Sequence, residues 1–234
     1  MHLYATIAGM ERVLCTTLHS PMCAFSFCRT GLVFPHGLAV FAFDDWSTFS
    51  AVSATFHGDW AWAYCSTLGG HTLRYTPSDG FETFPFPDAT TGLDDIGGRY
   101  YTHRQSIMLA RQEGLTKTYN RFHNPDEHAE DIATLRRLHV EMDHAVAAAY
   151  SWADLALDHG FHQTKQGRRY TISELARREV LGRLLSLNHA RYAEEVLQGL
   201  HDKGAKKAGK AASNGAAKGK RAKVAVVQPA LFGD

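Results

Sequence analysis

The sequence contains no long apolar run and no targeting segment. No stretch approaches the roughly 20 consecutive apolar residues that a membrane-spanning helix requires. The first residues, MHLYATIAGMERV, lack the basic-then-apolar order of a secretory signal. We therefore expect a cytoplasmic protein that does not insert into a membrane.

Cysteine is also scarce, and all four cysteines stand in apolar surroundings: Cys15, Cys23, Cys28 and Cys65. This setting favours reduced, buried thiols over a disulfide framework. A metal site built from His19, Cys23 and Cys28 is an alternative. If residues 22–29 form a strand, however, Cys23 and Cys28 point to opposite faces, and we expect no metal site.

The common catalytic and nucleotide-binding signatures are missing as well. The chain has no G-x-x-x-x-G-K-[ST] phosphate loop, no G-x-G-x-x-G after a strand, no H-E-x-x-H and no G-x-S-x-G. The neighbouring pairs Glu127-His128 and Asp143-His144 lie in a predicted helix, where adjacent side chains face different directions. We therefore expect no self-contained active site in this chain.

Charge is distributed unevenly along the chain. The formal net charge of +1 divides into +7 for residues 203–234, which hold eight Lys or Arg and one acid, and −6 for residues 1–202. Residues 203–223 are mostly Ala, Gly and Lys, with too few apolar residues to fold, so we predict a flexible, disordered basic tail. The acidic body and the basic tail have to be interpreted separately.

The first 45 residues alternate short β-favouring runs with turn signals. The predicted strands are residues 3–7, 12–18, 23–28 and 38–43. The chain begins almost inside the first of them, so we interpret this region as the second half of a domain whose first half is missing. Asp44 or Asp45 is a candidate N-cap, and apolar residues at three- and four-residue spacing predict one helix to about Trp60.

Three of the seven prolines fall within residues 74–87, RYTPSDGFETFPFP. Proline fixes φ and keeps the preceding residue extended, so the run Phe84-Pro85-Phe86-Pro87 is predicted to be neither helix nor central strand. We interpret the segment as a rigid joint whose phenylalanines pack between two layers. An ordinary proline-rich loop that covers apolar surface is the alternative.

The second half of the chain has helical periodicity. After a polar linker at 88–98 we predict helices at 101–122 and 125–150, a loop-like insert at 151–169, and a third helix that ends at Gly199. The start of this third helix is marked by a capping box of Thr171 with Glu174 and by a hydrophobic staple of Tyr170 onto Leu175. The predicted fold is α+β: a partial β-rich lobe with one helix and the joint at 1–87, a domain of about three helices at 88–200, and the tail at 201–234.

Several polar and basic side chains have the chemistry that nucleic acid requires. Those that we single out as DNA-binding are Arg74, Tyr75, Ser78, Lys117, Asn120, Arg121, Arg168 and Arg169. Lys and Arg neutralise phosphates, while Asn and Arg read base edges. A Lys or Arg on a helix is equally typical of a solvated face. The aromatic cluster of Trp60, Trp62 and Tyr64 is more typical of a core than of base stacking.

An ordered series of motifs resembles a known family. The motifs are HGDWAWAYCSTLGG, RYTPSDGFETFPFP, GLTKTYNRFHNP, LRRLHVEMDHAVAAAYSW and YTISELARREVLGRLLSLNHARYAEE. Over about residues 1–200 they resemble the C-terminal part of the large adenine-specific DNA methyltransferases. This family comprises the MmeI-like type II restriction–modification enzymes and their relatives in the BREX and DISARM anti-phage systems. The resemblance implies the end of a target recognition domain followed by a helical segment.

The family's catalytic features are absent from this sequence. Neither the glycine-rich S-adenosylmethionine site nor the Asn-Pro-Pro-aromatic motif occurs, since Asp126 follows Asn124-Pro125. The resemblance therefore implies a cofactor-free, inactive chain: a fragment, a split subunit or the product of an interrupted gene. Its expected partners are double-stranded DNA and a methyltransferase catalytic domain or subunit that binds S-adenosylmethionine. The alternative is a non-enzymatic scaffold that binds proteins in a defence complex.

The end of the tail carries a motif of its own. Gln228, Leu231 and Phe232 resemble the short peptides by which bacterial DNA enzymes bind the replication sliding clamp, with Pro229 in place of the commoner Leu. A flexible stretch at 203–223 gives such a peptide reach. The alternative is that residues 224–232 fold back over apolar surface of the helices.

Overall fold

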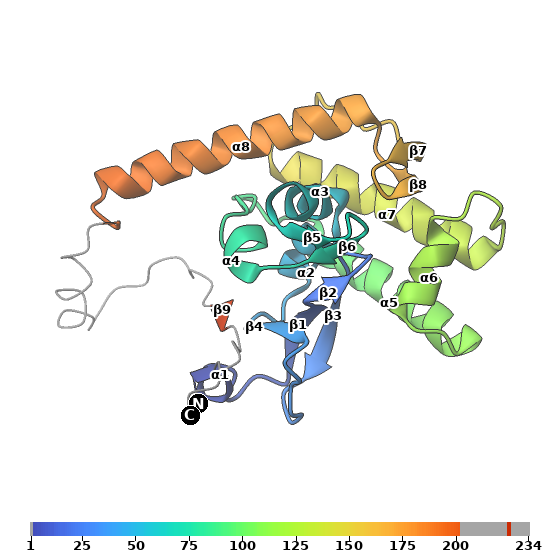
Figure 1. Cartoon of the computed structure of the whole chain (residues 1–234), viewed down its shortest axis with the longest axis horizontal. Helices are drawn as coiled ribbons and strands as arrows, with labels where there is room; N and C mark the ends of the chain where they lie inside the picture. Colours follow the sequence, from blue (N-terminus) through green and yellow to red (C-terminus); the bar gives the residue numbers. More distant parts are fainter. Residues whose placement is uncertain (1, 202–223, 226–234) are drawn as a thin grey trace.

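The computed structural model describes residues 2–201 and 224–225, and its fold is α+β, as predicted (Figure 1). The helices are α1 (His2–Thr6), α2 (Trp46–Ser53), α3 (Thr55–Tyr64), α4 (Pro77–Gly80), α5 (Leu93–Arg111), α6 (Leu115–Phe122), α7 (Glu130–Ala149) and α8 (Glu174–Leu197). The strands are β1 (Arg12–Thr17), β2 (His19–Ser20), β3 (Phe25–Arg29), β4 (Leu38–Phe41), β5 (Ser66–Leu68), β6 (Thr72–Arg74), β7 (Gly160–Thr164), β8 (Gly167–Thr171) and β9 (Val224–Ala225).

Two sequence predictions fall on parts that the structure does not describe. The flexible stretch at 203–223 and the clamp-like motif of Gln228, Leu231 and Phe232 lie outside the described residues. Among the helices that the structure does describe, none is long and apolar enough to cross a membrane.

The largest sheet has the strand order β3-β1-β4-β9 and is antiparallel throughout. β1 is central, with Leu14 opposite both Phe27 of β3 and Phe41 of β4. Both faces of β1 are covered: Leu14 belongs to the main core, while Val13 and Cys15 belong to a smaller cluster beneath α1. This two-sided burial explains why three consecutive residues of β1, Val13, Leu14 and Cys15, are apolar.

The first helix, α1, replaces the predicted strand at residues 3–7, so that prediction was wrong. Leu3 and Ile7 are four residues apart, so a helix places both on one face. Both are buried, and they pack with Val13 and Val40 on the outer face of the sheet. The periodicity of four was present in the sequence, but the segment is too short for its pattern to exclude a strand.

The predicted helix at 45–60 is divided in two at Ala54, which is extended with φ −66° and ψ 157°. Asp45 is the N-cap of α2, as predicted, and its carboxylate accepts the Thr48 N–H at 2.7 Å. α3 starts anew at Thr55, whose N–H donates to Asp143 Oδ1 of α7 at 2.8 Å. A carboxylate supplied by another helix thus caps α3, which the local sequence cannot reveal.

The predicted helix at 101–122 also consists of two helices, and the first of them begins earlier. α5 starts at Leu93, inside the predicted polar linker, and ends at Arg111; its C-cap, Gln112, has a left-handed φ of 51°. α6 follows Gly114, the weak point in the pattern. Gly97 allows α5 to cross α2 closely, because a Cβ there would lie 2.7 Å from the Trp46 carbonyl oxygen.

Residues 151–169 are not wholly loop-like, because β7 and β8 form an antiparallel hairpin there. Gly167, with φ 95°, makes its turn possible. The start of α8 is shifted accordingly: its N-cap is Ser173, which accepts the Ala176 N–H at 3.2 Å, and not Thr171, which pairs in β8. Leu175 is 79% exposed, so the predicted staple does not form.

The proline-rich joint packs between layers. Phe81 lies against Phe41 of the large sheet, with ring centroids 4.4 Å apart. Phe84 belongs to the apolar cluster that α7 and α8 complete, and the Tyr150 hydroxyl at the end of α7 donates to the Pro85 carbonyl at 2.8 Å. The joint thereby fixes the large sheet against the two long helices.

The β-rich and helical parts share one main core. It contains residues of β1, β3 and β4 together with residues of α5, α6 and α7. Arg104 of α5, only 2% exposed, connects them. Its guanidinium donates to the Phe25 carbonyl of β3 at 2.7 Å and to the Tyr119 hydroxyl of α6 at 3.0 Å. Division of the chain into domains at 1–87, 88–200 and 201–234 stays a prediction.

Candidate functional site

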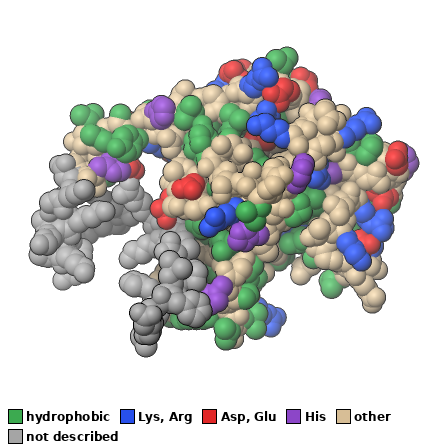
Figure 2. Space-filling model, viewed as in Figure 1, with side chains coloured by type: hydrophobic (Ala, Val, Ile, Leu, Met, Phe, Trp, Pro, Cys, Tyr) green, Lys and Arg blue, Asp and Glu red, His purple; other side chains and the backbone are tan. Residues whose placement is uncertain are grey.

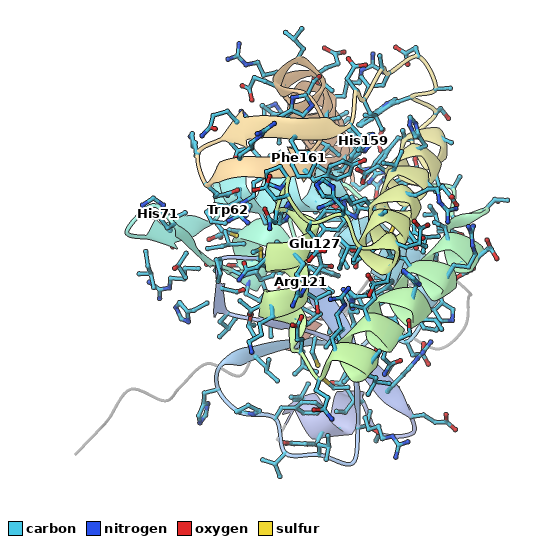
Figure 3. The ribbon with its side chains drawn as sticks, turned by 90° about the vertical axis from the view of Figure 1, so that its right-hand side faces the viewer. Trp62, His71, Arg121, Glu127, His159 and Phe161 are labelled. Atoms are coloured by element: carbon cyan, nitrogen blue, oxygen red, sulfur yellow. The ribbon has the colours of Figure 1, made fainter. Side chains whose placement is uncertain are left out.

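A groove of ≈ 720 Å³ is the candidate site. Its walls come from the segment after β2, from α3 and α6, from the β7–β8 hairpin and from the start of α8. Figure 3 shows α6 and both small hairpins, β5–β6 and β7–β8, on the face toward the viewer, with Trp62 of α3 among them. The groove therefore joins segments that are far apart in the sequence.

Asp143 of α7 is fully buried and connects α3 and the base of the β7–β8 hairpin to α7. Its carboxylate accepts the Thr55 N–H and hydroxyl at 2.8 and 2.7 Å, and His159, just before β7, donates to it at 2.8 Å. Burial raises the pKa of Asp143, but His139, His159 and Thr55 outweigh burial, and the pKa is lowered. An ionised carboxylate thus fixes α3 and the base of the hairpin to α7.

Polar atoms without hydrogen-bond partners gather at this groove. Four of its lining residues contain a buried one: Ser53 Oγ, Asp59 Oδ2, His123 Nδ1 and His139 Nδ1. Within residues 2–201 and 224–225, the one further such atom is His57 Nδ1, which lies elsewhere. Most buried polar atoms in proteins are hydrogen-bonded. Several buried atoms without partners in one groove therefore indicate a site for water or a ligand.

Asp59 of α3 is the chemically most unusual of these groups. Burial raises its pKa to about 7, with Asp143 and Glu174 acting in the same direction and Arg177 opposing them. Neutral and ionised forms are therefore both accessible near neutral pH. His123 differs, because burial and the nearby Arg169 lower its pKa to about 3 and leave it uncharged.

Replacing Asp59 by Asn is expected to stabilise the protein, and increasingly so as pH rises. The pKa of Asp59 is higher in the folded than in the unfolded chain, so its ionisation costs stability between the two pKa values. We expect the advantage of Asp59→Asn in unfolding free energy to grow by about 2 kcal/mol from about pH 5.5 to about pH 8. Urea denaturation at both pH values measures it. An advantage that is the same at both would contradict the raised pKa.

Unpaired cations border the groove. Lys165 and Arg169 line it, and the exposed Arg168 lies between them in the hairpin, with its guanidinium 5.7 Å from the Phe161 ring centre. None of these three cations forms an ion pair with any residue of the described ranges. They remain available for an anionic ligand.

The structure distributes the eight predicted DNA-binding residues over four elements: β6 (Arg74), α4 and the segment before it (Tyr75, Ser78), α6 (Lys117, Asn120, Arg121) and β8 (Arg168, Arg169). α6, β6 and β8 lie on the face shown in Figure 3. Arg74, Ser78, Lys117, Asn120 and Arg168 are exposed, and Arg121 and Arg169 are half-buried. Their part in DNA binding stays a prediction.

The prediction of DNA binding requires side chains that are exposed and not already paired. Tyr75 and Arg121 do not meet this condition. Tyr75 is 2% exposed, and its hydroxyl lies 2.9 Å from His57 Nε2, so it is a core residue. Arg121 pairs with Glu113 at 2.7 Å and with Glu127 at 2.8 Å. These ion pairs neutralise its charge and anchor α6, so Arg121 is not free to bind a phosphate.

Sequence reasoning missed Lys165 and Asp59 and assigned Trp62 to the core. Lys165 sits in the turn of a hairpin that was read as a loop. Asp59 and Trp62 are three residues apart in α3, a spacing that places them on one helix face, and that was the available signal. Trp62 is half-buried and contacts the edge of the main core.

The face drawn in Figure 2 has no continuous positive patch. Lys and Arg side chains are scattered singly among acidic ones there. This agrees with the net charge of −6 for residues 1–202. Long-range attraction to an anionic polymer is therefore weak for this body, and binding has to depend on local contacts.

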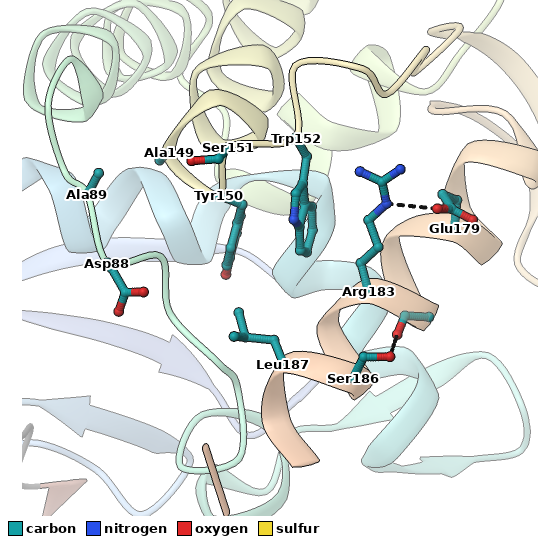
Figure 4. A pocket seen from close by; sticks show the side chains of 11 residues that line it. Asp88, Ala89, Ala149, Tyr150, Ser151, Trp152, Glu179, Arg183, Ser186 and Leu187 are labelled. Atoms are coloured by element: carbon teal, nitrogen blue, oxygen red, sulfur yellow. Dashed lines mark hydrogen bonds and ion pairs between the residues drawn. The ribbon is translucent and has the colours of Figure 1, made fainter. Parts of the chain in front are cut away.

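A second cavity, of ≈ 620 Å³, lies between the end of α7 and α8 (Figure 4). Of its charged residues, Arg183 is already paired with Glu179 and Asp154, at 2.7 and 2.6 Å, and Asp88 is paired with Arg191 at 2.8 Å. Tyr150 stacks on Trp152, with ring centroids 4.5 Å apart. Because its polar groups are satisfied, this cavity is a weaker candidate. Nowhere in the described residues do three or more His, Cys, Asp or Glu gather as a metal site.

Comparison with known proteins concerns the fold. No protein-family model matches the sequence, and the search of curated proteins gives no match. A solved structure with a similar fold is that of the type IIL restriction–modification enzyme MmeI in complex with DNA. The TM-score is 0.52 at 15% sequence identity, and the similarity covers 79% of this chain and 22% of the MmeI chain. Most of this chain therefore folds like one part of MmeI.

Proposed function

We propose that this chain is the DNA-contacting, target-recognition part of a restriction–modification enzyme. The observation that carries the proposal is the fold shared with a part of MmeI, whose structure contains DNA. The groove face, by which we mean the surface formed by α6 and the β7–β8 hairpin around the groove, supports the proposal. Its cations Lys165, Arg168 and Arg169 form no ion pair with the described residues. Cations of this kind hold phosphates, which position a protein on the duplex.

Different elements of the groove face are suited to contact the DNA backbone and the bases. The β7–β8 hairpin offers cations to the backbone, while Lys117 and Asn120 project from the exposed side of α6. Asn is a residue that reads base edges. The Asp143 network holds α3, α7 and the hairpin rigidly, so that contacts made from these elements keep a fixed spacing.

DNA binding by the chain is expected to depend steeply on salt. Each phosphate that a Lys or Arg neutralises adds about 0.9 to the slope of log K against log salt concentration. Fluorescence anisotropy with a labelled duplex, titrated at several salt concentrations, measures the slope. We expect a slope of about −3 or steeper, from the three hairpin cations. Absence of binding at low salt would contradict the proposal.

Methyl transfer belongs, in this proposal, to a catalytic domain or subunit outside the chain. The resemblance to adenine-specific methyltransferases of cytoplasmic restriction and anti-phage systems implies a site for S-adenosylmethionine, but its glycine-rich and Asn-Pro-Pro-aromatic motifs are not in this sequence. Isothermal titration of the chain with S-adenosylmethionine is expected to show no saturable heat. A clear saturable heat would overturn this division.

A scaffold that binds protein is the second candidate, and α8 favours it. The C-terminal half of α8 extends from the body in Figure 1. It exposes Tyr192 (56%), Val196 (48%) and Leu197 (88%). An apolar helix face of this kind is typical of a protein contact. The two functions are compatible if α8 holds the catalytic partner while the groove face holds DNA.

A further inference from the structure

The groove holds groups that phosphate contacts leave unused. The basic residues at its border can bind the phosphates of DNA. Within the groove, however, three buried atoms have no hydrogen-bond partner: Ser53 Oγ, Asp59 Oδ2 and His123 Nδ1. Leaving a buried polar group unpaired costs about 1–3 kcal/mol. Three such groups in one groove indicate a ligand that both donates and accepts hydrogen bonds.

Trp62 provides a flat apolar surface beside these groups. Each of the other three tryptophans contacts another aromatic ring, whereas Trp62 contacts none within the described part of the chain. It lines the groove three residues after Asp59 on α3. In Figure 3 it lies between the β5–β6 hairpin, marked by His71, and Phe161 of β7. A half-buried indole that no other aromatic ring of the described residues covers is suited to stacking a planar ring.

We propose that this groove binds a single unpaired nucleobase, stacked on Trp62 and hydrogen-bonded by Asp59. The inference rests on the proposed function, since it assumes that DNA lies on this face. The groove volume of ≈ 720 Å³ is within the range of about 300–1,000 Å³ typical of small-molecule sites.

Asp59 has the donor and the acceptor that the edge of a base requires. Cytosine and adenine each present an amino group beside an unprotonated ring nitrogen. A protonated carboxyl matches this edge, because its carbonyl oxygen accepts from the amino group while its O–H donates to the ring nitrogen. Thymine presents an N–H beside a carbonyl, and the same carboxyl matches it by accepting from the N–H and donating to the carbonyl. The pKa of about 7 keeps the protonated form of Asp59 accessible.

Neighbouring groups hold the rest of such a nucleotide. Arg169 lines the same groove, and its guanidinium donates to the Met22 sulfur at 3.9 Å. Lys165 lies at the hairpin turn. Both cations can therefore take the phosphates on either side of a displaced base, which couples the base site to the backbone contacts.

The test compares one duplex in four forms by fluorescence anisotropy: fully paired, and with a single extra cytosine, thymine or abasic residue in one strand. We expect the cytosine and thymine bulges to bind about tenfold more tightly than the paired duplex, and the abasic bulge to gain much less. Equal affinity for all three bulges would overturn the base site while leaving DNA binding intact. Failure of every duplex to bind would overturn the proposed function, and this inference with it.

Variants assign the preference to the groove. Trp62→Ala and Asp59→Leu are expected to abolish the cytosine gain without weakening the paired duplex. Asp59→Asn is expected to keep it, because an amide has the same donor and acceptor as the protonated carboxyl. Tyr64→Ala is the matched control: Tyr64 is on the same helix, 42% exposed, and outside the groove. A cytosine gain that survives Asp59→Leu would contradict the assignment, even if Trp62→Ala fails to fold.

Discussion

Replacing Asp143 by Ala is expected to lower the free energy of unfolding by about 3–5 kcal/mol. The carboxylate is fully buried and accepts three hydrogen bonds, two from Thr55 and one from His159. Its removal leaves the start of α3 uncapped and buried donors unpaired. Urea denaturation followed by circular dichroism measures the loss.

A matched control separates this effect from the loss of any carboxylate. Asp154 pairs with Arg183 at 2.6 Å, but its side chain is 65% exposed. Exposed ion pairs contribute about 0–1 kcal/mol, so Asp154→Ala is expected to change stability little. If Asp143→Ala were no more destabilising than Asp154→Ala, the network would not be what holds the groove elements together.

Replacing Lys165, Arg168 and Arg169 together by Ala is expected to weaken duplex binding about tenfold or more at low salt. It should also reduce the slope of log K against log salt by about 2.7, which is 0.9 for each lost phosphate contact. The reason is that these hairpin cations have no ion-pair partner in the described residues and adjoin the groove. Anisotropy at several salt concentrations gives both quantities.

The control is a triple variant with the same loss of positive charge. Arg99, Arg137 and Arg183 each pair with a carboxylate in the structure. Their replacement by Ala should leave the salt slope unchanged, because cations already paired with carboxylates are not expected to contact phosphates. Equal effects from the two triple variants would mean that net charge, rather than the hairpin, governs binding.

The fold class and much of the helical part could be predicted because local patterns determine them. The apolar spacing of α7 and the Asp45 cap are properties of adjacent residues, and both are found in the structure. The break at Ala54 was not predictable, because the group that caps α3 there is Asp143, 88 residues away in the sequence. The hairpin was missed because its two strands are short and interrupted by polar residues.

The candidate site was only partly predictable for the same reason. Arg168 and Arg169 were identified from their charge alone, and the structure brings Arg169 to the groove. Arg121 also fits a charge-based criterion, but its partners Glu113 and Glu127 become neighbours only through the turn before α6 and the loop after it. Burial removes Tyr75 from the surface, which the alternation of apolar and polar residues around it does not reveal.

Hydrogen–deuterium exchange of the chain, with and without a DNA duplex at low salt, tests the central claim most directly. The claim is that DNA lies on the face formed by the β7–β8 hairpin and α6. We predict slower exchange on binding at residues 160–171 and 115–123, and unchanged exchange in the C-terminal half of α8. Protection confined to α8, with the hairpin unaffected, would contradict the claim.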